Sequence, residues 1–313
     1  NNTATAGSDY VAASGVVSFN PGETSKTITV LVNGDTVVEP NETFFVNLTS
    51  ATNATIADGQ GVGTIIDNDF SSAAALAAQR LEIRELVSGL SQPTAMGFIN
   101  PGDILVLQKA DGRVRRVING VLQAGEVLDV AVDSASERGL LGIAVHPQFP
   151  ATPFVYLYYT ESSTVSDTSG APAPFGNRVY RYTWNGSTLT NPVLILDLPV
   201  IPGPNHDGGT MVFGPYGKLY VVIGELNRNG QLQNVSGGAL PDNTGVIFRI
   251  NDDGSAPSDN PFFALGGNLA KYFAYGIRNS FGLAFDPLTR ALWDTENGPT
   301  NYDEINLVQT GFN

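Results

Sequence analysis

The sequence contains two histidines, and their surroundings differ. His206 lies in the segment NHDGG, directly before Asp207, where the glycines predict a loop rather than a strand. A histidine with a pKa near its ordinary value of about 6.5 suits a general base, and an arginine such as Arg278 suits stabilisation of an oxyanion. On residue type alone, a hydrogen-bonded turn is the more common explanation of a loop histidine beside an aspartate. His146, which precedes a proline after an apolar stretch, is interpreted as part of a structural turn.

Acidic side chains gather in the loops predicted for the first seventy residues. Carboxylate and amide oxygens brought to one end of a sheet sandwich suit Ca²⁺, a hard cation that takes six to eight oxygen ligands. The alternative is a set of solvated acidic loops that only aid solubility, and residue type leaves both open. The candidate ligands are Asp9, Glu39, Glu42, Asp67, Asn68 and Asp69.

Composition excludes several chemistries. The 313 residues include no cysteine, so disulfides, thiolate zinc sites, cysteine-ligated iron–sulfur clusters and covalent c-type haem are impossible. Two histidines are too few for a multi-histidine metal site. Glycine and proline are abundant, with 35 and 19 copies, which is typical of a folded protein rich in turns.

The net charge of −14 is unevenly distributed. Residues 1–70 hold one basic residue, Lys26, and eight acidic ones, and therefore carry half of the net charge. Such a surface repels nucleic-acid phosphates and anionic lipid, so we expect cations rather than polyanions as partners. No apolar stretch approaches the roughly 20 residues that span a bilayer.

Hydrophobic periodicity predicts an all-β protein of two domains. Period-two alternation over residues 16–19, 26–32 and 43–48 predicts antiparallel strands of a sandwich. The small-residue stretch 71–79 is predicted to be a linker, and it separates residues 1–70 from residues 80–313.

After the linker the pattern changes to short strands separated by turns, without helical periodicity. Recurring pairs of an apolar strand, a turn and a second strand favour a β-propeller over βαβ units. The predicted strands are residues 81–86, 104–108, 114–118, 140–145, 155–159, 179–184, 218–223, 246–250, 283–285 and 291–293.

The first region resembles the Calx-β domain. The resemblance rests on GSDY, SFNPGETSKTITV, NGDTVVEPNETFFVNL and GTIIDNDF, and it covers residues 1–70. It implies an immunoglobulin-like sandwich that binds Ca²⁺ through acidic loops at one end. The family's first strand, with one acidic ligand position, has no counterpart in the sequence.

The second region resembles the glucose/sorbosone dehydrogenase family, the soluble quinoprotein sugar dehydrogenases. The resemblance rests on five ordered phrases over residues 80–313: ERGLLGIAVHPQF, NHDGG, FGPYGKLYVVIGE, GIRNSFGLAFDP and DTENGPTNYDEINL. It implies a six-bladed β-propeller that binds pyrroloquinoline quinone (PQQ) and Ca²⁺.

The resemblance also implies roles for single residues. His206 corresponds to the general base that takes the sugar's anomeric hydroxyl proton, and Arg278 corresponds to the residue facing the quinone oxygen. Asn279 corresponds to a cofactor contact. The remaining correspondences are Gly298 and Pro299, whose carbonyls hold the Ca²⁺ that orients PQQ, and Asp303, a ligand of a further structural Ca²⁺.

The chain departs from the family pattern in three places. Where the dehydrogenases have Gln before GlyGlyLeuLeuGly, it has Glu137-Arg138, and where they have Asp after IleGly, it has Glu225. Glu137 and Glu225 are therefore candidate cofactor contacts that can move PQQ or change the substrate. The sequence also stops where the family continues through its last blades, so we expect four to five blades, with further sequence or a second chain completing the ring.

The expected function is PQQ- and calcium-dependent oxidation of a sugar, from aldose to lactone, by hydride transfer, with electrons passing to an external acceptor. An extracellular, periplasmic or cell-surface location is expected from the domain pairing and the cofactor type. The main alternative is a non-enzymatic extracellular module that uses Ca²⁺ for adhesion, assembly or carbohydrate binding. A lactonase-type propeller hydrolase is a third possibility, and the ordered phrases match it less well.

Overall fold

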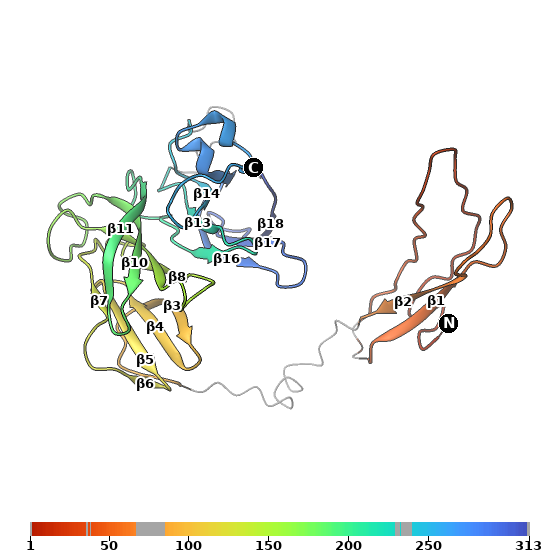
Figure 1. Ribbon diagram of the computed structural model, residues 1–313, viewed down its shortest axis with the longest axis horizontal. Helices are drawn as coiled ribbons and strands as arrows, with labels where there is room; N and C mark the ends of the chain where they lie inside the picture. Colours follow the sequence, from red (N-terminus) through yellow and green to blue (C-terminus); the bar gives the residue numbers. More distant parts are fainter. Residues whose placement is uncertain are drawn as a thin grey trace. The chain divides into compact units, whose positions relative to one another are not determined.

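The computed structural model describes residues 2–35, 37, 39–66, 85–228, 232 and 240–311. The chain divides into two compact units, Asn1–Arg84 and Glu85–Asn313 (Figure 1). The predicted linker at residues 71–79 lies outside the described residues, so the predicted domain boundaries stay predictions. Within the described part, no helix has the length and apolar character needed to cross a membrane.

The first unit is built on one antiparallel strand pair, β1 (Glu42–Asn47) and β2 (Gln60–Ile65). Phe44 of β1 is buried and stacks on Tyr10, with 4.9 Å between the ring centroids. Ala4 completes this small core. The strand predicted over residues 43–48 is therefore confirmed.

The strands predicted over residues 16–19 and 26–32 are wrong for this structure. Neither segment forms a strand ladder; Val32, at the end of the second, makes an isolated bridge with Tyr10. Val16 is 93% exposed and Leu31 is 64% exposed, so no second sheet formed by the described residues covers their alternating apolar face. Period-two alternation produces a strand only where such a face is covered. The sandwich itself stays a prediction.

The second unit consists of four antiparallel sheets, formed in chain order by neighbouring strands (Figure 1). Apart from the short last strand of the first sheet, strands that follow one another in the chain pair side by side in each sheet. The first sheet holds β3 (Pro93–Asn100), β4 (Asp103–Gln108), β5 (Arg113–Ile118), β6 (Val121–Leu122) and β7 (Leu128–Asp129), and the second holds β8 (Leu140–Val145), β9 (Phe154–Glu161), β10 (Gly176–Trp184) and β11 (Leu189–Leu198). The third holds β12 (Met211–Phe213), β13 (Leu219–Ile223), β14 (Val246–Ile250) and β15 (Tyr272–Tyr275), and the fourth holds β16 (Ser280–Phe285), β17 (Leu292–Glu296) and β18 (Glu304–Val308). Two 3₁₀ turns, η1 (Phe263–Leu265) and η2 (Leu269–Lys271), precede β15.

The first strand of each sheet contacts the first strand of the next. Thus β3 lies beside β8, β8 beside β12, and β12 beside β16. This succession is the arrangement of propeller blades around a common axis. The described residues therefore form four consecutive propeller-like blades, which confirms the all-β prediction, whereas a total of six blades stays a prediction.

Apolar side chains fill the spaces between neighbouring blades. Leu107 of β4 and Leu157 of β9 belong to the cluster between the first two sheets, and Tyr158 of β9 belongs to the cluster between the second and third. Tyr220 of β13 packs edge-on against Phe285 of β16, with ring centroids 5.0 Å apart, between the third and fourth. Because β13 and β14 are buried at every position, the third sheet provides rigid support for the loops at its ends.

Candidate active site

Loops at the strand ends carry the predicted site residues of the second unit. Glu137 precedes β8, and His206 lies between β11 and β12. Glu225 follows β13, and Arg278 and Asn279 lie between β15 and β16. Propeller blades bring such loops together at one end of the ring, where strand ends from several sheets can supply one site.

Hydrogen bonds connect these five residues into one group. The His206 backbone N–H donates to Glu137 Oε2 at 2.6 Å. The Asn279 amide donates to the same Glu137 oxygen at 3.4 Å, and the Glu225 N–H donates to the Arg278 carbonyl at 2.9 Å. The His206 ring contacts the Glu225 carboxylate. The structure therefore brings together the residues that sequence analysis selected as catalytic and cofactor-binding.

The contact between His206 and Glu225 determines which ring nitrogen is available. His206 Nδ1 lies within hydrogen-bonding distance of Glu225 Oε1, and the His206 and Glu225 side chains are 12% and 1% exposed. When the Glu225 carboxylate is ionised it can only accept hydrogen bonds, and the ring proton of His206 is then on Nδ1. Nε2 is then left as an acceptor, which is the state that a general base requires.

Glycines allow the backbones of this site to approach closely. A Cβ atom on Gly224 would lie 2.5 Å from both the His206 and the Arg278 carbonyl oxygens. Gly209 has a φ of +102°, and a Cβ there would lie 2.8 Å from the Leu141 side chain. His206 itself has a φ of +63°, a left-handed conformation that is uncommon for residues other than glycine. Surrounding contacts must therefore hold the His206 backbone in place.

Asp207 is a site residue that sequence analysis noted only as the neighbour of His206. Its side chain is fully buried, and Oδ1 accepts a hydrogen bond from Asn177 Nδ2 at 2.9 Å. The Tyr158 hydroxyl donates to the Asp207 carbonyl at 2.7 Å. Burial raises the pKa of the Asp207 carboxyl to about 6, although the Asn177 bond and the nearby Arg138 charge oppose the rise. The sequence signal was the charged residue in a glycine-rich loop, and its burial could not be read from it.

Arg278 lies beside an open cavity of about 430 Å³. Its backbone N–H donates to a Glu296 carboxylate oxygen, and its guanidinium donates to the Asn297 carbonyl at 2.6 Å. Gly298 and Pro299 line the same cavity, so the residues predicted to face the quinone and to hold Ca²⁺ share one space. The other lining residues are Leu232, Gly276, Glu296, Asn297, Asn301, Tyr302, Glu304 and Asn306.

Glu296 is a second residue that sequence analysis missed. Burial raises the pKa of its carboxyl to about 7, while the hydrogen bond from the Arg278 amide lowers that pKa. The charges of Asp294 and Glu304 raise it further. Glu296 and Glu304 are directly opposite each other on β17 and β18, which places two acids on one wall of the cavity. The phrase DTENGP contained this residue, but its partner on the next strand was visible only in the structure.

The predicted metal ligand Asp303 forms part of a turn beside the cavity. Its Oδ1 accepts a hydrogen bond from the Gly298 backbone N–H at 3.0 Å, and the residue is exposed. In the portion of the chain that the structure describes, Asp303 belongs to no cluster of three or more carboxylate or imidazole ligand atoms. Its role as a Ca²⁺ ligand stays a prediction.

The residues at the cavity fit a quinone that binds with a cation. The Arg278 guanidinium and the Asn279 amide are donors suited to quinone or carboxylate oxygens. Five buried carboxylate or amide oxygens of the described residues have no hydrogen-bond partner, and two of them, Asn279 Oδ1 and Glu225 Oε2, belong to the His206 group. Buried polar atoms normally have partners, so these two atoms are available to donors of a bound molecule.

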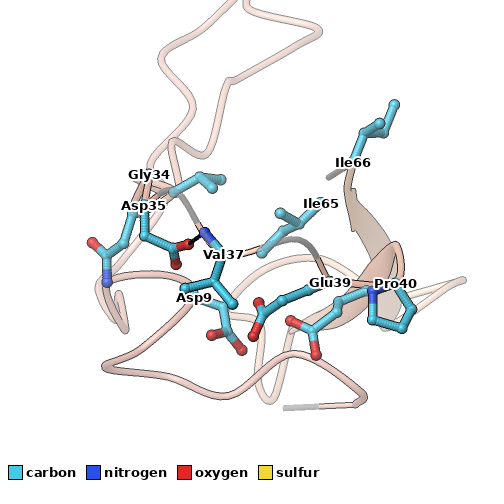
Figure 2. A pocket seen from close by; sticks show the side chains of 11 residues that line it. Asp9, Gly34, Asp35, Val37, Glu39, Pro40, Ile65 and Ile66 are labelled. Atoms are coloured by element: carbon cyan, nitrogen blue, oxygen red, sulfur yellow. Dashed lines mark hydrogen bonds between the residues drawn. The ribbon is translucent and has the colours of Figure 1, made fainter. Parts of the chain in front are cut away.

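The first unit contains a separate acidic cluster (Figure 2). Ligand oxygens of Asp9, Glu39 and Glu42 lie within 4.8 Å of one another, beside a cavity of about 100 Å³. Desolvation raises the pKa of Glu42, and the charges of Asp9 and Glu39 raise it further. Hydrogen bonds from Ser8 and from the Thr5 amide lower the pKa of Asp9. The predicted ligands Asp67, Asn68 and Asp69 lie outside the described residues.

Two family models match separate parts of the chain. The family model for glucose/sorbosone dehydrogenase matches residues 90–313, and that for the Calx-beta domain matches residues 1–69. Quinoprotein glucose dehydrogenase B of Acinetobacter calcoaceticus is 32% identical over 75% of this chain and 52% of its own length. Aldose sugar dehydrogenase YliI of Escherichia coli is 30% identical over 78% of this chain and 64% of its own length.

Solved structures show the same similarity. The PQQ-bound form of aldose sugar dehydrogenase from Streptomyces coelicolor is 30% identical, with a TM-score of 0.60 over 73% of this chain and 63% of that one. The chain thus spans between half and two thirds of the length of these relatives. With a family model covering most of its residues, the chain belongs to the glucose/sorbosone dehydrogenase family and carries a Calx-beta domain match at residues 1–69.

Proposed function

We propose that this protein oxidises sugars with PQQ and Ca²⁺, converting an aldose to its lactone. The observation that carries the proposal is the His206–Glu225 pair, which lies one backbone hydrogen bond from Arg278. Arg278 in turn lines the cavity that contains Gly298 and Pro299. The reaction needs a base, a cation and backbone carbonyls: the cation and the carbonyl-bearing residues line the cavity, and the base is linked to them through Glu225 and Arg278.

The protein's own residues position the sugar and move one proton. His206 Nε2 accepts the proton of the anomeric hydroxyl, and Glu225 stabilises the resulting charge on the ring. Glu137 fixes the His206 backbone through the 2.6 Å hydrogen bond. Arg278 supplies a positive charge next to the oxygen that becomes more negative.

The cofactor would be held by Arg278 and Asn279, with Ca²⁺ on the carbonyls of Gly298 and Pro299. When bound, PQQ and its Ca²⁺ would supply the hydride acceptor and the Lewis acid for the reaction. An external acceptor would take up the electrons.

The test is reconstitution of the chain with PQQ and CaCl₂, followed by measurement of aldose-dependent dye reduction. We expect His206→Asn to lower kcat by about 10²- to 10⁴-fold without loss of PQQ uptake, which is followed by absorbance. His146→Gln, at the other histidine, is the matched control and should retain turnover. Undiminished turnover in the His206 variant, or a wild-type chain that takes up no PQQ, would refute the proposal.

We also propose that the protein acts outside the cytoplasm, in the extracellular space, in the periplasm or at the cell surface. The pairing of a Calx-beta domain with a quinoprotein domain supports this location. Cell fractionation of the native host, with an antibody against the chain, tests it. Recovery in the cytoplasmic fraction alone would contradict it.

A second proposed function is Ca²⁺ binding by the first unit. The cluster of Asp9, Glu39 and Glu42 supports it, because three carboxylates whose oxygens lie within 4.8 Å repel one another without a cation. If Ca²⁺ raises the Tm while the chain takes up no PQQ, a non-enzymatic adhesion or assembly module becomes the better explanation. Both effects together support an enzyme with a calcium-binding domain.

A further inference from the structure

The side chain of Arg138 lies in the interior beside Asp207, the residue that follows His206. Arg138 is 6% exposed, and each of its three guanidinium nitrogens faces a different group. NH1 lies 3.6 Å from Asp133 Oδ1, NH2 donates a hydrogen bond to the Val200 carbonyl, and Nε lies 3.9 Å from Asp207 Oδ1. The planar guanidinium is the side-chain group that can contact three such partners at once.

Two of these partners belong to the loop that carries His206. Residues 199–210 connect β11 to β12 without regular secondary structure. Arg138 contacts this loop near its beginning, at Val200, and again at Asp207, next to His206. Between them, Gly203 packs so closely on the guanidinium that a Cβ atom there would overlap with it. The Arg138 side chain therefore contacts the part of the loop that leads from β11 to His206.

The third partner provides a fixed point. Asp133 is fully buried, and its carboxylate accepts hydrogen bonds from Gly170 N–H at 2.7 Å and from Thr168 Oγ1 at 3.0 Å. Asp133 is thus held by a separate loop, and Arg138 connects that loop to the loop of His206. A buried guanidinium between two buried carboxylates is costly to disrupt, because removing it leaves unpaired charge in the interior.

We propose that Arg138 is a positioning residue for His206, holding the loop 199–210 so that His206 keeps its left-handed backbone and its ring stays against Glu225. The inference rests on the proposed function only in assigning His206 as the base. Arg138 acts through Asp207 and Val200, and it touches neither the sugar nor the cofactor. The alternative is a purely structural role, in which loss of Arg138 lowers stability and leaves the His206 ring unchanged.

The test uses the full chain without cofactor and observes the histidine rings directly. The sequence has two histidines, so ¹⁵N-edited NMR spectra of the rings contain two sets of signals, which His206→Asn assigns by difference. Arg138→Met keeps the apolar stem and removes the guanidinium. Arg249→Met is the matched control, because Arg249 is also 6% exposed and also pairs with an aspartate, Asp259, at 2.7 Å.

We expect the wild-type His206 ring to show one fixed tautomer, protonated at Nδ1. In Arg138→Met the His206 signals should broaden or move to averaged tautomer positions, whereas Arg249→Met should leave them in place. Arg138→Lys keeps the charge and presents a single nitrogen, so it should not restore the fixed tautomer. It also serves as the test variant if Arg138→Met does not fold. An unchanged His206 tautomer in a folded Arg138 variant would overturn the proposal.

Activity provides a second, separate readout. In the PQQ-loaded chain, Arg138→Met should lower kcat by about 10²-fold and change KM little, as expected for a misplaced catalytic group. If the wild-type chain takes up no PQQ, the proposed function fails, and the ring spectra still decide the role of Arg138. If turnover is present and the ring is unaffected by the substitution, the positioning role alone fails.

Discussion

His206 Nδ1 contacts Glu225 Oε1, and the two residues flank the two neighbouring strands β12 and β13. His206 precedes β12, and Glu225 directly follows β13, so the pairing of these strands brings imidazole and carboxylate together. The orientation of the proposed base therefore depends on the register of the most buried sheet of the second unit.

Glu225→Gln should lower kcat of the PQQ-loaded chain by about 10²-fold or more with little change in KM. The amide can donate to Nδ1 as well as accept from it, so the ring is free to carry its proton on Nε2, where it cannot act as a base. Steady-state dye reduction measures the loss, and PQQ absorbance shows whether the cofactor is retained.

Glu161→Gln is the control for that experiment. Glu161 is a half-buried carboxylate that, like Glu225, makes side-chain hydrogen bonds: it accepts them from Arg178 at 2.7 Å and Tyr180 at 2.8 Å, and these partners lie outside the His206 group. It should retain turnover. Equal activity of the Glu225 variant and the wild type would show that the tautomer of His206 is not held by this carboxylate.

The fold of the second unit was largely predictable, because buried strands carry continuous apolar runs. The predicted strand over residues 246–250 coincides with β14, and the one over 218–223 contains β13. β3 and β11 were missed because a proline lies at the start of one and inside the other, which weakens the strand signal. In the first unit the alternation over residues 26–32 predicted a strand that lacks a covering sheet.

Site residues that belong to short sequence motifs could be selected from the sequence. Residues whose importance comes from their burial could not. His206, Arg278 and Asn279 were selected from local sequence, and the structure places them in one group with Glu137 and Glu225. The roles of these residues stay predictions. The sequence showed Arg138 and Asp207 only as charged residues. It does not reveal that these two residues, 69 positions apart, are both buried and lie next to each other.

Gly224→Ala should destabilise the second unit by about 1–3 kcal/mol and lower turnover. The new methyl would lie 2.5 Å from the carbonyl oxygens of both His206 and Arg278, so those two backbones must separate. Gly61→Ala is the control, since a Cβ at Gly61 meets nothing within 4 Å. Thermal unfolding and dye reduction measure the two effects. A Gly224 variant that matches the Gly61 variant in both would contradict the packing.

Glu42→Gln should weaken Ca²⁺ binding by the cofactor-free chain by about tenfold or more. Glu42 shares a cluster with Asp9 and Glu39, and the number of charged ligands sets Ca²⁺ affinity. Isothermal titration with CaCl₂ measures the change, and removal of Ca²⁺ by a chelator should lower the Tm of the wild type. Glu23→Gln, which loses an ion pair with Lys26 in the same unit, is the control and should bind Ca²⁺ normally. Identical titrations of both variants would exclude the cluster as a ligand site.

Asp207→Asn should make the protein more stable at neutral pH and remove part of its pH dependence. Burial raises the pKa of Asp207 from 3.8 to about 6, so the folded state holds this proton more tightly than the unfolded state. The contribution of Asp207 to the free energy of unfolding is therefore fully favourable below about pH 4. It is lost as the pH rises to about 6, by about 3 kcal/mol. The asparagine has no proton to lose and can still accept the hydrogen bond from Asn177.

Urea unfolding of wild type and variant at pH 4.5 and pH 7.5 tests this sign. The free energy of unfolding of the wild type should fall relative to the variant between the two values. Asp286→Asn is the control: backbone hydrogen bonds lower the pKa of Asp286 below its ordinary value of 3.8, so this carboxylate is ionised at both pH values and its removal should leave the pH dependence between them unchanged. Parallel pH profiles for wild type and Asp207→Asn would mean that the buried carboxylate is ionised at low pH. Arg138 would then compensate the charge of Asp207.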